Sequence, residues 1–247
     1  MMNIYGIKRV DLEKYFLCNG EKKFKALQVF EWLYDKRVTS FDLMTNLGKN
    51  LVKKLETDFY FDSLKIIKRQ DDKDVSKFLI ELSDNNHIEA VLMNHDYGNS
   101  LCISTQVGCN MGCKFCESGR LKKVRNLDAY EMVEQILLVE ADIGERIDSV
   151  VIMGIGEPFD NYQNIINFIK IINSPIGLAI GARHITVSTS GLIPKIEEFM
   201  NLDLQVNLAI SLHVPNNELR NKLMPVNKAY PLNELIDVLN EIYRKYG

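Results

Sequence analysis

In the stretch Val107-Gly-Cys-Asn-Met-Gly-Cys-Lys-Phe-Cys116, three cysteines follow a CxxxCxxC spacing. Iron–sulfur clusters and structural zinc sites usually take four protein ligands, which close the metal to other molecules. A cubane cluster held by three cysteines instead leaves one iron free to bind a small molecule. The spacing therefore favours a cluster with an open iron on Cys109, Cys113 and Cys116. The alternatives are three unrelated thiols, or a zinc knuckle that takes its fourth ligand from Cys102 or a histidine.

Around this loop, strand-like and helix-like stretches alternate from residue 98 onward. Four strands are predicted, at Leu101–Gln106, Ser149–Met153, His184–Ser188 and Gln205–Leu212. Four helices are predicted, at Ala129–Ile143, Tyr162–Ile172, Ile193–Met200 and Leu232–Tyr246. Such alternation is typical of right-handed βαβ units on a parallel sheet, either doubly wound or rolled into a barrel.

Polar and glycine-rich segments follow the ends of these strands, where barrels gather their chemistry. They are the cysteine loop, Gly154-Ile-Gly-Glu-Pro158, Ser188-Thr-Ser-Gly191 and Ser211-Leu-His213. The glycines would let the backbone approach a ligand, and Glu157 would accept hydrogen bonds from a cationic amine. Each segment also has a structural interpretation: an ordinary turn, serines that cap helices, or a histidine bonded to backbone. Their common edge favours one shared site.

Residues 1–97 are predicted to form an N-terminal domain, and residues 98–247 the core. Amphipathic spacing predicts helices at Phe24–Tyr34 and Thr45–Leu55. From about Leu64 the apolar period becomes two, and Asp84-Asn85-Asn86 is typical of a turn. A β-hairpin is therefore predicted from Ser76–Leu82 and His87–Met93. The domain boundary is placed near Tyr97-Gly98-Asn99.

Composition narrows the function only slightly. The chain has 247 residues, 46% of them hydrophobic, and a formal charge of −3. Five basic residues nevertheless cluster against Glu117 alone, at Lys114, Arg120, Lys122, Lys123 and Arg125. This stretch is either a phosphate-binding surface or a solvated loop. Five cysteines, with neither a signal-like start nor a long apolar run, predict a reducing cytoplasm and no membrane association.

Together these residues resemble the radical S-adenosylmethionine RNA adenine-C2 methyltransferases, the RlmN and Cfr group. The resemblance covers nearly the whole chain and is specific to this branch. It is carried by Leu101–Cys109, Met153–Pro158, Arg183–Gly191, Ser211–Pro215, Lys222–Asn227 and Phe24–Tyr34. It implies an α/β fold, a partial (βα) barrel that is incomplete at its C-terminal end and follows a small helical domain and a β-hairpin.

The resemblance also implies cofactors. A [4Fe–4S] cluster would sit on Cys109, Cys113 and Cys116, and S-adenosylmethionine would chelate its open iron through the methionyl amine and carboxylate. The positions that match the family's cofactor-holding residues are Gly156, Glu157, Ser188, Ser211, Leu212 and His213. The cofactors supply the radical chemistry, and the protein orients them and excludes water.

In the reaction that the resemblance implies, one S-adenosylmethionine methylates a C-terminal cysteine and a second generates a radical on that methyl group. The carbon adds to C2 of adenine in 23S rRNA and tRNA. Cys102 matches the cysteine that releases the product, and Glu89 matches the carboxylate that takes the C2 proton. From the residues alone, Cys102 is a buried strand residue and Glu89 a solvent-facing one.

Family members continue beyond the point where this sequence stops, and the methyl-carrying cysteine lies in that region; Cys18 matches nothing. The chain is therefore expected to be truncated and not competent for full turnover. The implied partners are 23S rRNA, tRNA and an electron donor such as flavodoxin. The protein itself is expected to be a cytoplasmic monomer. Two other classes remain open: a radical SAM enzyme on another substrate, and a non-enzymatic RNA-binding module with zinc.

Overall fold

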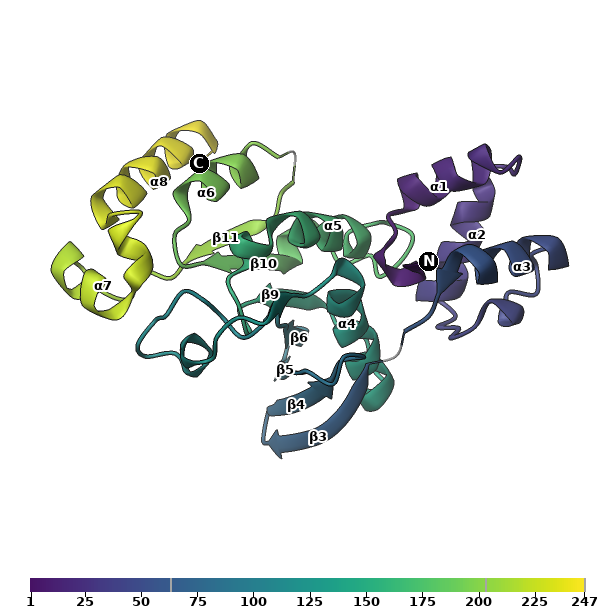
Figure 1. Cartoon of the computed structure of the whole chain (residues 1–247), viewed down its shortest axis with the longest axis horizontal. Coiled ribbons are helices and arrows are strands. Elements are labelled where there is room, and N and C mark those ends of the chain that lie inside the picture. Colours follow the sequence, from purple (N-terminus) through teal and green to yellow (C-terminus); the bar gives the residue numbers. More distant parts are fainter. Residues whose placement is uncertain (63, 203, 247) are drawn as a thin grey trace.

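The computed structural model of the protein describes residues 1–62, 64–202 and 204–246. Three regions follow one another along the molecule (Figure 1). A group of small helices from the start of the chain lies at one end, a curved sheet with its helices lies in the middle, and the last two helices lie at the other end.

The N-terminal region consists of short elements around one helical core. It contains β1 (Met2–Asn3), a 3-10 turn at Ile4–Gly6, α1 (Arg9–Cys18), α2 (Phe24–Tyr34), a 3-10 turn at Phe41–Leu43, α3 (Lys49–Asp58) and β2 (Phe59–Tyr60). Helix α2 has the predicted bounds. Helix α3 begins four residues after the predicted Thr45, because Gly48 is extended at its N-cap and the buried Leu47 packs from the loop.

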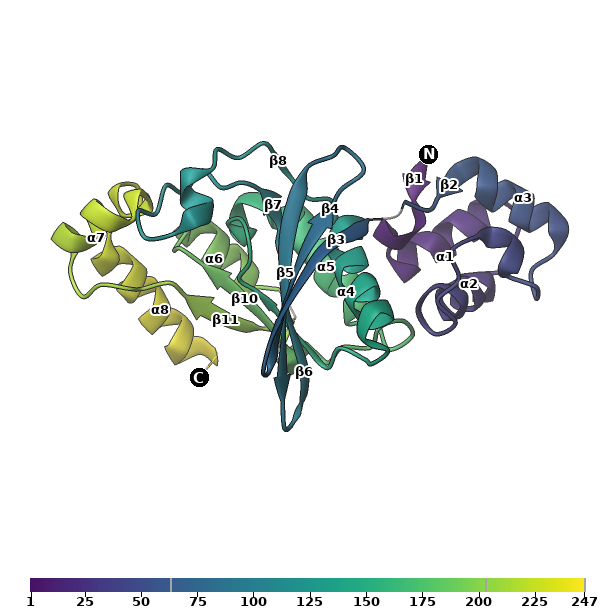
Figure 2. The same cartoon turned by 90° about the horizontal axis from the view of Figure 1, so that it is seen from below.

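A seven-stranded sheet organises the rest of the chain in the order β11-β10-β9-β6-β5-β4-β3. The strands are β3 (Lys65–Asp72), β4 (Val75–Glu81), β5 (His87–His95), β6 (Gly98–Cys102), β9 (Ser149–Ile152), β10 (Ile185–Thr189) and β11 (Asn207–Ile210). Strands β6, β9, β10 and β11 pair in parallel, whereas β3 to β6 pair antiparallel. The predicted parallel βαβ core and the predicted hairpin, now β4 and β5, are both confirmed. Figure 2 shows the sheet nearly edge on.

The predicted domain boundary falls at the turn between β5 and β6. His95 pairs with Gly98 across this turn, and β3, β4 and β5 continue the same sheet as the parallel strands. Hydrogen bonding therefore runs through residue 97 without interruption. The division into residues 1–97 and 98–247 stays a prediction.

Helices cover one face of the parallel strands. Helices α4 (Ala129–Ile143), α5 (Tyr162–Ile172), α6 (Ile193–Met200) and α8 (Leu232–Tyr246) have the predicted bounds. Beneath the helices, alternate strand residues are fully buried, at Leu101, Ile103, Val150, Ile152, Ile185 and Val187. Strand side chains alternate between faces, so Cys102, Val151 and Thr186 point to the opposite, less buried face. We call this second surface the open face.

One arginine ties the hairpin to the core. Arg125 Nε donates to Asp84 Oδ2 at 2.6 Å in the hairpin turn, and its two terminal nitrogens donate to the carboxylate oxygens of Glu131 at 2.8 Å. Glu131 is buried and also completes the capping box of α4 with Asp128. We call the ion pairs of Arg125 with Asp84 and Glu131 the clasp. The clasp links the β4–β5 turn, the short strand β8 (Arg125–Asn126) and the start of α4.

We expect Arg125→Met to lower the free energy of unfolding by about 3 kcal/mol, because it leaves the buried Glu131 carboxylate without its partner. Arg120→Met is the control from the same loop: Arg120 pairs with the exposed Glu117, and its loss should cost less than about 1 kcal/mol. Urea unfolding of both variants measures the difference. Equal effects would show that the clasp adds no stability.

Candidate cluster and cofactor site

The four segments predicted to share one edge do lie together at the carboxyl ends of β6, β9, β10 and β11, and hydrogen bonds tie each segment to the next. The Gly154 N–H donates to the Ile103 carbonyl at 3.0 Å, and the Thr105 N–H to the Ile155 carbonyl at 2.8 Å. The Ser211 N–H donates to the Thr189 carbonyl at 2.9 Å. We call this edge the rim.

The cysteine loop leaves the end of β6 through β7 (Gln106–Val107) and is folded tightly on itself. Gly108 has a φ of +74°, and a Cβ there would lie 2.2 Å from the Lys122 carbonyl oxygen. A Cβ on Gly119 would lie 2.7 Å from the Cys113 carbonyl oxygen. The loop therefore closes only because both positions lack a side chain.

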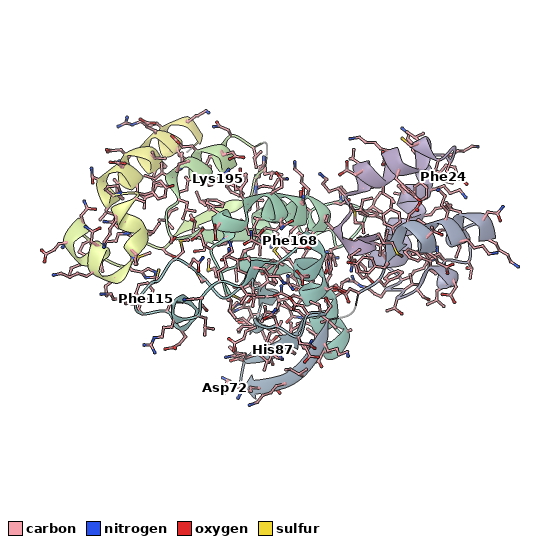
Figure 3. The ribbon with its side chains drawn as sticks, viewed as in Figure 1. Phe24, Asp72, His87, Phe115, Phe168 and Lys195 are labelled. Carbon is pink, nitrogen blue, oxygen red and sulfur yellow. The ribbon has the colours of Figure 1, made fainter. Side chains whose placement is uncertain are left out.

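The far side of the loop rests on helix α7 (Asn217–Leu223). The Lys114 N–H donates to the Leu223 carbonyl at 2.9 Å. The Phe115 ring lies 4.6 Å from the His213 ring, centroid to centroid. Figure 3 labels Phe115 on this loop, at the end of the molecule that carries α7. Contacts within the loop and contacts with the rim segment that follows β11 thus both hold the loop in place.

The three thiols influence one another. Burial, followed by the neighbouring Cys109 and Cys116, raises the pKa of Cys113 to about 11. Burial also raises the pKa of Cys109, with a smaller contribution from Cys116. Cys109 and Cys113 therefore hold their protons more tightly than a free thiol, and a metal must displace these protons, as thiolate ligation requires.

This donor set fits an iron–sulfur cluster better than zinc. In the part of the chain that the structure describes, no group of three or more His, Cys, Asp or Glu side chains is arranged around a single metal ion. A cubane differs, because each cysteine binds a different iron and the sulfurs need not converge on one point. Cys102, one proposed fourth zinc ligand, lies on β6 and its thiol accepts a hydrogen bond from the Met153 N–H.

The Gly154-to-Pro158 turn packs against the segment at the end of β6. A Cβ on Gly154 would lie 2.6 Å from the Ile103 carbonyl oxygen, and one on Gly156, where φ is +114°, would lie 2.6 Å from Thr105 Oγ1. Gly154 and Gly156 allow the rim segment after β9 to pack closely against the rim segment after β6. That these glycines also let the backbone approach a ligand stays a prediction.

Glu157 links two rim segments. It is 3% exposed, its Oε1 accepts from the Phe159 N–H at 3.1 Å, and its Oε2 accepts from the Ser190 N–H at 2.8 Å. Burial raises its pKa, while these hydrogen bonds act in the opposite direction. Each oxygen keeps a second lone pair, so Glu157 can still accept from a cationic amine.

Ser188 and Ser211 do not cap helices. Their hydroxyl oxygens lie 3.5 Å apart on adjacent strand ends, whereas α7 is capped by Asn216, which accepts from the Leu219 N–H at 2.9 Å. Leu212 and His213 are exposed, and His213 has a left-handed backbone with φ 59°. The backbone thus turns sharply at the rim and directs His213 towards the cysteine loop rather than into the core.

Glu89 and Cys102 share the open face. Cys102 pairs with Val91 across β5 and β6, and Glu89 lies two residues from Val91 on the same face of β5. Glu89 Oε1 lies 2.6 Å from Lys77 Nζ on β4, and both side chains are partly exposed. The solvent-facing interpretation of Glu89 agrees with this position, and Cys102 is half-buried rather than fully buried.

Sequence reasoning missed Arg220. This residue of α7 is fully buried, and its guanidinium donates to the Ser190 carbonyl at 2.6 Å, the Ser211 carbonyl at 3.3 Å and Asn227 Oδ1 at 2.9 Å. Burial lowers its pKa, and the nearby Cys113 opposes this effect. In a short polar helix an arginine normally faces solvent, so the sequence carried no signal for this contact.

The basic stretch is only partly available to a ligand. Lys123 Nζ pairs with Asp160 at 2.7 Å, and Arg125 is held in the clasp described above. Arg120 pairs with Glu117 at 3.1 Å. Lys114 and Lys122 are exposed. Three of the five cations therefore serve ion pairs within the protein, and only Lys114 and Lys122 are left for either interpretation of the stretch.

Comparison with known proteins agrees with this site. Residues 2–60 match the ribosomal RNA large subunit methyltransferase N-terminal domain, and residues 103–246 match the radical SAM superfamily. A solved radical SAM methyltransferase from Sphaerobacter thermophilus superposes with a TM-score of 0.89 at 37% identity, over 98% of this chain and 72% of that one. The fold is thus that of a radical SAM enzyme, as expected.

Two curated relatives carry the name probable dual-specificity RNA methyltransferase RlmN. The Enterococcus faecalis protein is 54% identical over 98% of this chain and 70% of its own length. The Caldanaerobacter subterraneus protein is 53% identical over 96% of this chain and 69% of its own length. The chain belongs to the RlmN family of radical SAM RNA methyltransferases. This family implies a [4Fe–4S] cluster and S-adenosylmethionine as cofactors. Among the described residues, no helix is both long and apolar enough to cross a bilayer.

We expect Cys113→Ala to abolish cluster assembly, because two thiolates cannot hold a cubane. Cys18→Ala removes an exposed cysteine of α1 and should leave the iron content unchanged. Iron and sulfide are measured after anaerobic reconstitution. Full iron content in Cys113→Ala would contradict the assignment.

We expect Arg220→Met to lower the free energy of unfolding by about 2–4 kcal/mol, because two buried carbonyls and Asn227 lose a charged donor. Lys222→Met, an exposed position on the same helix, should change it by less than about 0.5 kcal/mol. Chemical denaturation compares the two. A neutral Arg220→Met would mean that the rim does not depend on this residue.

Proposed function

We propose that the rim and the open face serve the methylation of C2 of an adenosine in 23S rRNA and in tRNA, with the rim holding the cofactors and the open face presenting the reacting side chains. One observation carries the proposal: Glu89, Cys102 and Ser188 come from three different strands and share the face beside the cysteine loop. Residues with only structural roles have no reason to gather there.

Cofactor binding divides between the loop and the rim. Cys109, Cys113 and Cys116 would hold the cluster, which when bound supplies the electron that cleaves S-adenosylmethionine. The groups proposed to hold S-adenosylmethionine are Gly156, Glu157, Ser188, Ser211, Leu212 and His213. The buried Glu157 suits the methionyl ammonium, because a fixed carboxylate in a dry site attracts a cation strongly.

Two side chains of the open face act on the RNA base. The Glu89 carboxylate accepts the C2 proton, and the Lys77 ammonium at 2.6 Å holds that carboxylate in place. The Cys102 sulfur would attack the sulfur of the thioether that joins the base to the methyl-carrying cysteine. A disulfide forms, the carbon–sulfur bond breaks, and its electron pair stays on the carbon, which takes a proton to become the methyl group of the product. Burial raises the pKa of Cys102, so its proton must leave before the sulfur attacks, and the Met153 N–H favours the thiolate.

RNA specificity rests on the relatives, which are named as dual-specificity RNA methyltransferases. The N-terminal match to a ribosomal RNA methyltransferase domain supports the same substrate class. Lys114 and Lys122 offer exposed positive charge beside the cysteine loop. The electron must come from outside the chain, and a flavodoxin is our proposed donor.

For the reaction, we expect Cys102→Ala, expressed from its complete coding sequence, to assemble a normal cluster and to trap a covalent protein–RNA adduct, because the product cannot be released. Cys18→Ala should release C2-methyladenosine normally. Gel shift under denaturing conditions and mass spectrometry of digested RNA provide the measurements. Normal product release by Cys102→Ala would return Cys102 to a packing role.

For RNA binding, we expect Lys114→Ala with Lys122→Ala to reduce the slope of log affinity against log salt by about two, because each lost phosphate contact removes one released counterion. The matched control is Lys170→Ala with Lys195→Ala, which removes the same charge from α5 and α6 on the helical face. A slope unchanged in the first variant would show that the loop does not contact phosphate.

A further inference from the structure

A large cavity lies away from the rim, between the N-terminal helices and α4. Its volume is about 820 Å³, which is within the range of small-molecule sites. The walls come from the segment after α2, the 3-10 turn at Ile4–Gly6, the residues Phe61, Asp62 and Leu64, and α4. The same turn packs directly on α4. Nothing in the proposed reaction uses this space.

One buried acid lines the cavity without a partner. Glu134 of α4 is 4% exposed, and its Oε2 has no hydrogen-bond partner in the part of the chain that the structure describes. Burying such a group costs free energy unless something pairs with it. The free Oε2 of this buried acid is therefore available to pair with a ligand.

The cations on the cavity wall are engaged elsewhere. Arg37 has a left-handed backbone with φ 56° and donates to Glu140. Arg146 donates to the Leu178 carbonyl at 2.7 Å and to the Ala179 carbonyl at 3.2 Å. Neither arginine therefore neutralises Glu134. Further negative charge comes from Asp62, close enough to act on Glu134.

Aromatic rings form the opposite wall. The Tyr5 ring lies 5.6 Å from Phe61 and 6.0 Å from Tyr34, centroid to centroid. The Tyr5 hydroxyl donates to the Val38 carbonyl and the Tyr34 hydroxyl donates to the Tyr5 carbonyl, each at 3.3 Å. Both hydroxyls are thus committed, and the rings offer apolar and π surface to the cavity.

We propose that this cavity binds a small organic ammonium ion, with Glu134 as its carboxylate partner and Tyr5, Tyr34 and Phe61 as its aromatic wall. Carboxylates and aromatic faces together are the groups that bind such cations. A bare metal ion fits less well, because no group of three acidic, His or Cys side chains in the described residues is arranged around one.

Binding is coupled to a proton. Burial, followed by the charges of Asp62 and Glu131, raises the pKa of Glu134 to about 9, so the Glu134 carboxyl is protonated at pH 7 when the cavity is empty. Tyr5 and Tyr34 face the same carboxyl and stay protonated, since their pKa values are raised too. The remaining charged groups of the wall are Asp35, Arg37, Asp62, Glu140, Glu145 and Arg146. An ammonium ligand must therefore displace the Glu134 proton, and its affinity rises with pH up to about pH 9.

The test uses the whole chain and putrescine as the probe, with 1,4-butanediol as its neutral isostere. Calorimetry should detect putrescine but not the diol, and the affinity should rise by up to about tenfold per pH unit between pH 7 and 8.5. Glu134→Gln keeps the side-chain shape and should weaken binding by about tenfold or more. Glu218→Gln makes the same substitution on α7, at the other end of the molecule, and should leave binding unchanged.

Proton release by the wild-type chain gives a second test that needs no variant. Titration of the wild-type chain in two buffers of different ionisation enthalpy should show about one proton released per putrescine bound at pH 7. No putrescine binding, equal binding by Glu134→Gln, or binding without proton release would each overturn the proposal.

Discussion

The fold depends on one constraint, the burial of alternate residues of the parallel strands beneath α4, α5 and α6. Leu101, Val150 and Ile185 form a fully buried row, and the helices can cover only one face of each strand. Because side chains alternate along a strand, the neighbours of these residues must point to the open face. Slipping any strand by one residue would turn its apolar set to water, so the same force that folds the core also places the side chains that we propose to react.

At the rim, two buried side chains add to the backbone hydrogen bonds that join the segments. Glu157 accepts N–H groups from the segments after β9 and β10, and Arg220 donates to carbonyls of the segments after β10 and β11. Strand hydrogen bonding ends there, and the two side chains supply the donors and acceptors that the loops lack. Hydrogen bonds to a charged group are stronger than neutral ones, which keeps the loops in place around a cofactor.

Much of this arrangement could be predicted from the sequence. Periodicity gave the bounds of α4, α5, α6 and α8, because each has a clear apolar stripe. The gathering of the cysteine, glycine and serine segments followed from parallel topology alone. The candidate roles of Glu89 and Cys102 came only from family resemblance, since a strand position shows no chemistry by itself.

What could not be predicted depends on contacts between distant residues. In the sequence, Arg220 lies among polar residues and looks solvated. In the structure, three oxygens from separate segments surround its guanidinium. Lys123 and Arg125 looked like free cations, but Asp160 and Asp84 lie opposite them only after folding. The Glu134 cavity likewise exists only because the N-terminal turn packs on α4.

The clasp of Arg125 has a practical consequence for mutagenesis. An alanine scan of the basic loop would include Arg125 beside the exposed Lys122, and both variants would lose positive charge. Only the Arg125 variant would also break the clasp between the start of α4 and the hairpin that carries Glu89. A loss of methylation in that variant would be attributed to weaker substrate affinity although its cause was a displaced active-site strand, so loop variants should be compared by their folded fraction before their activity.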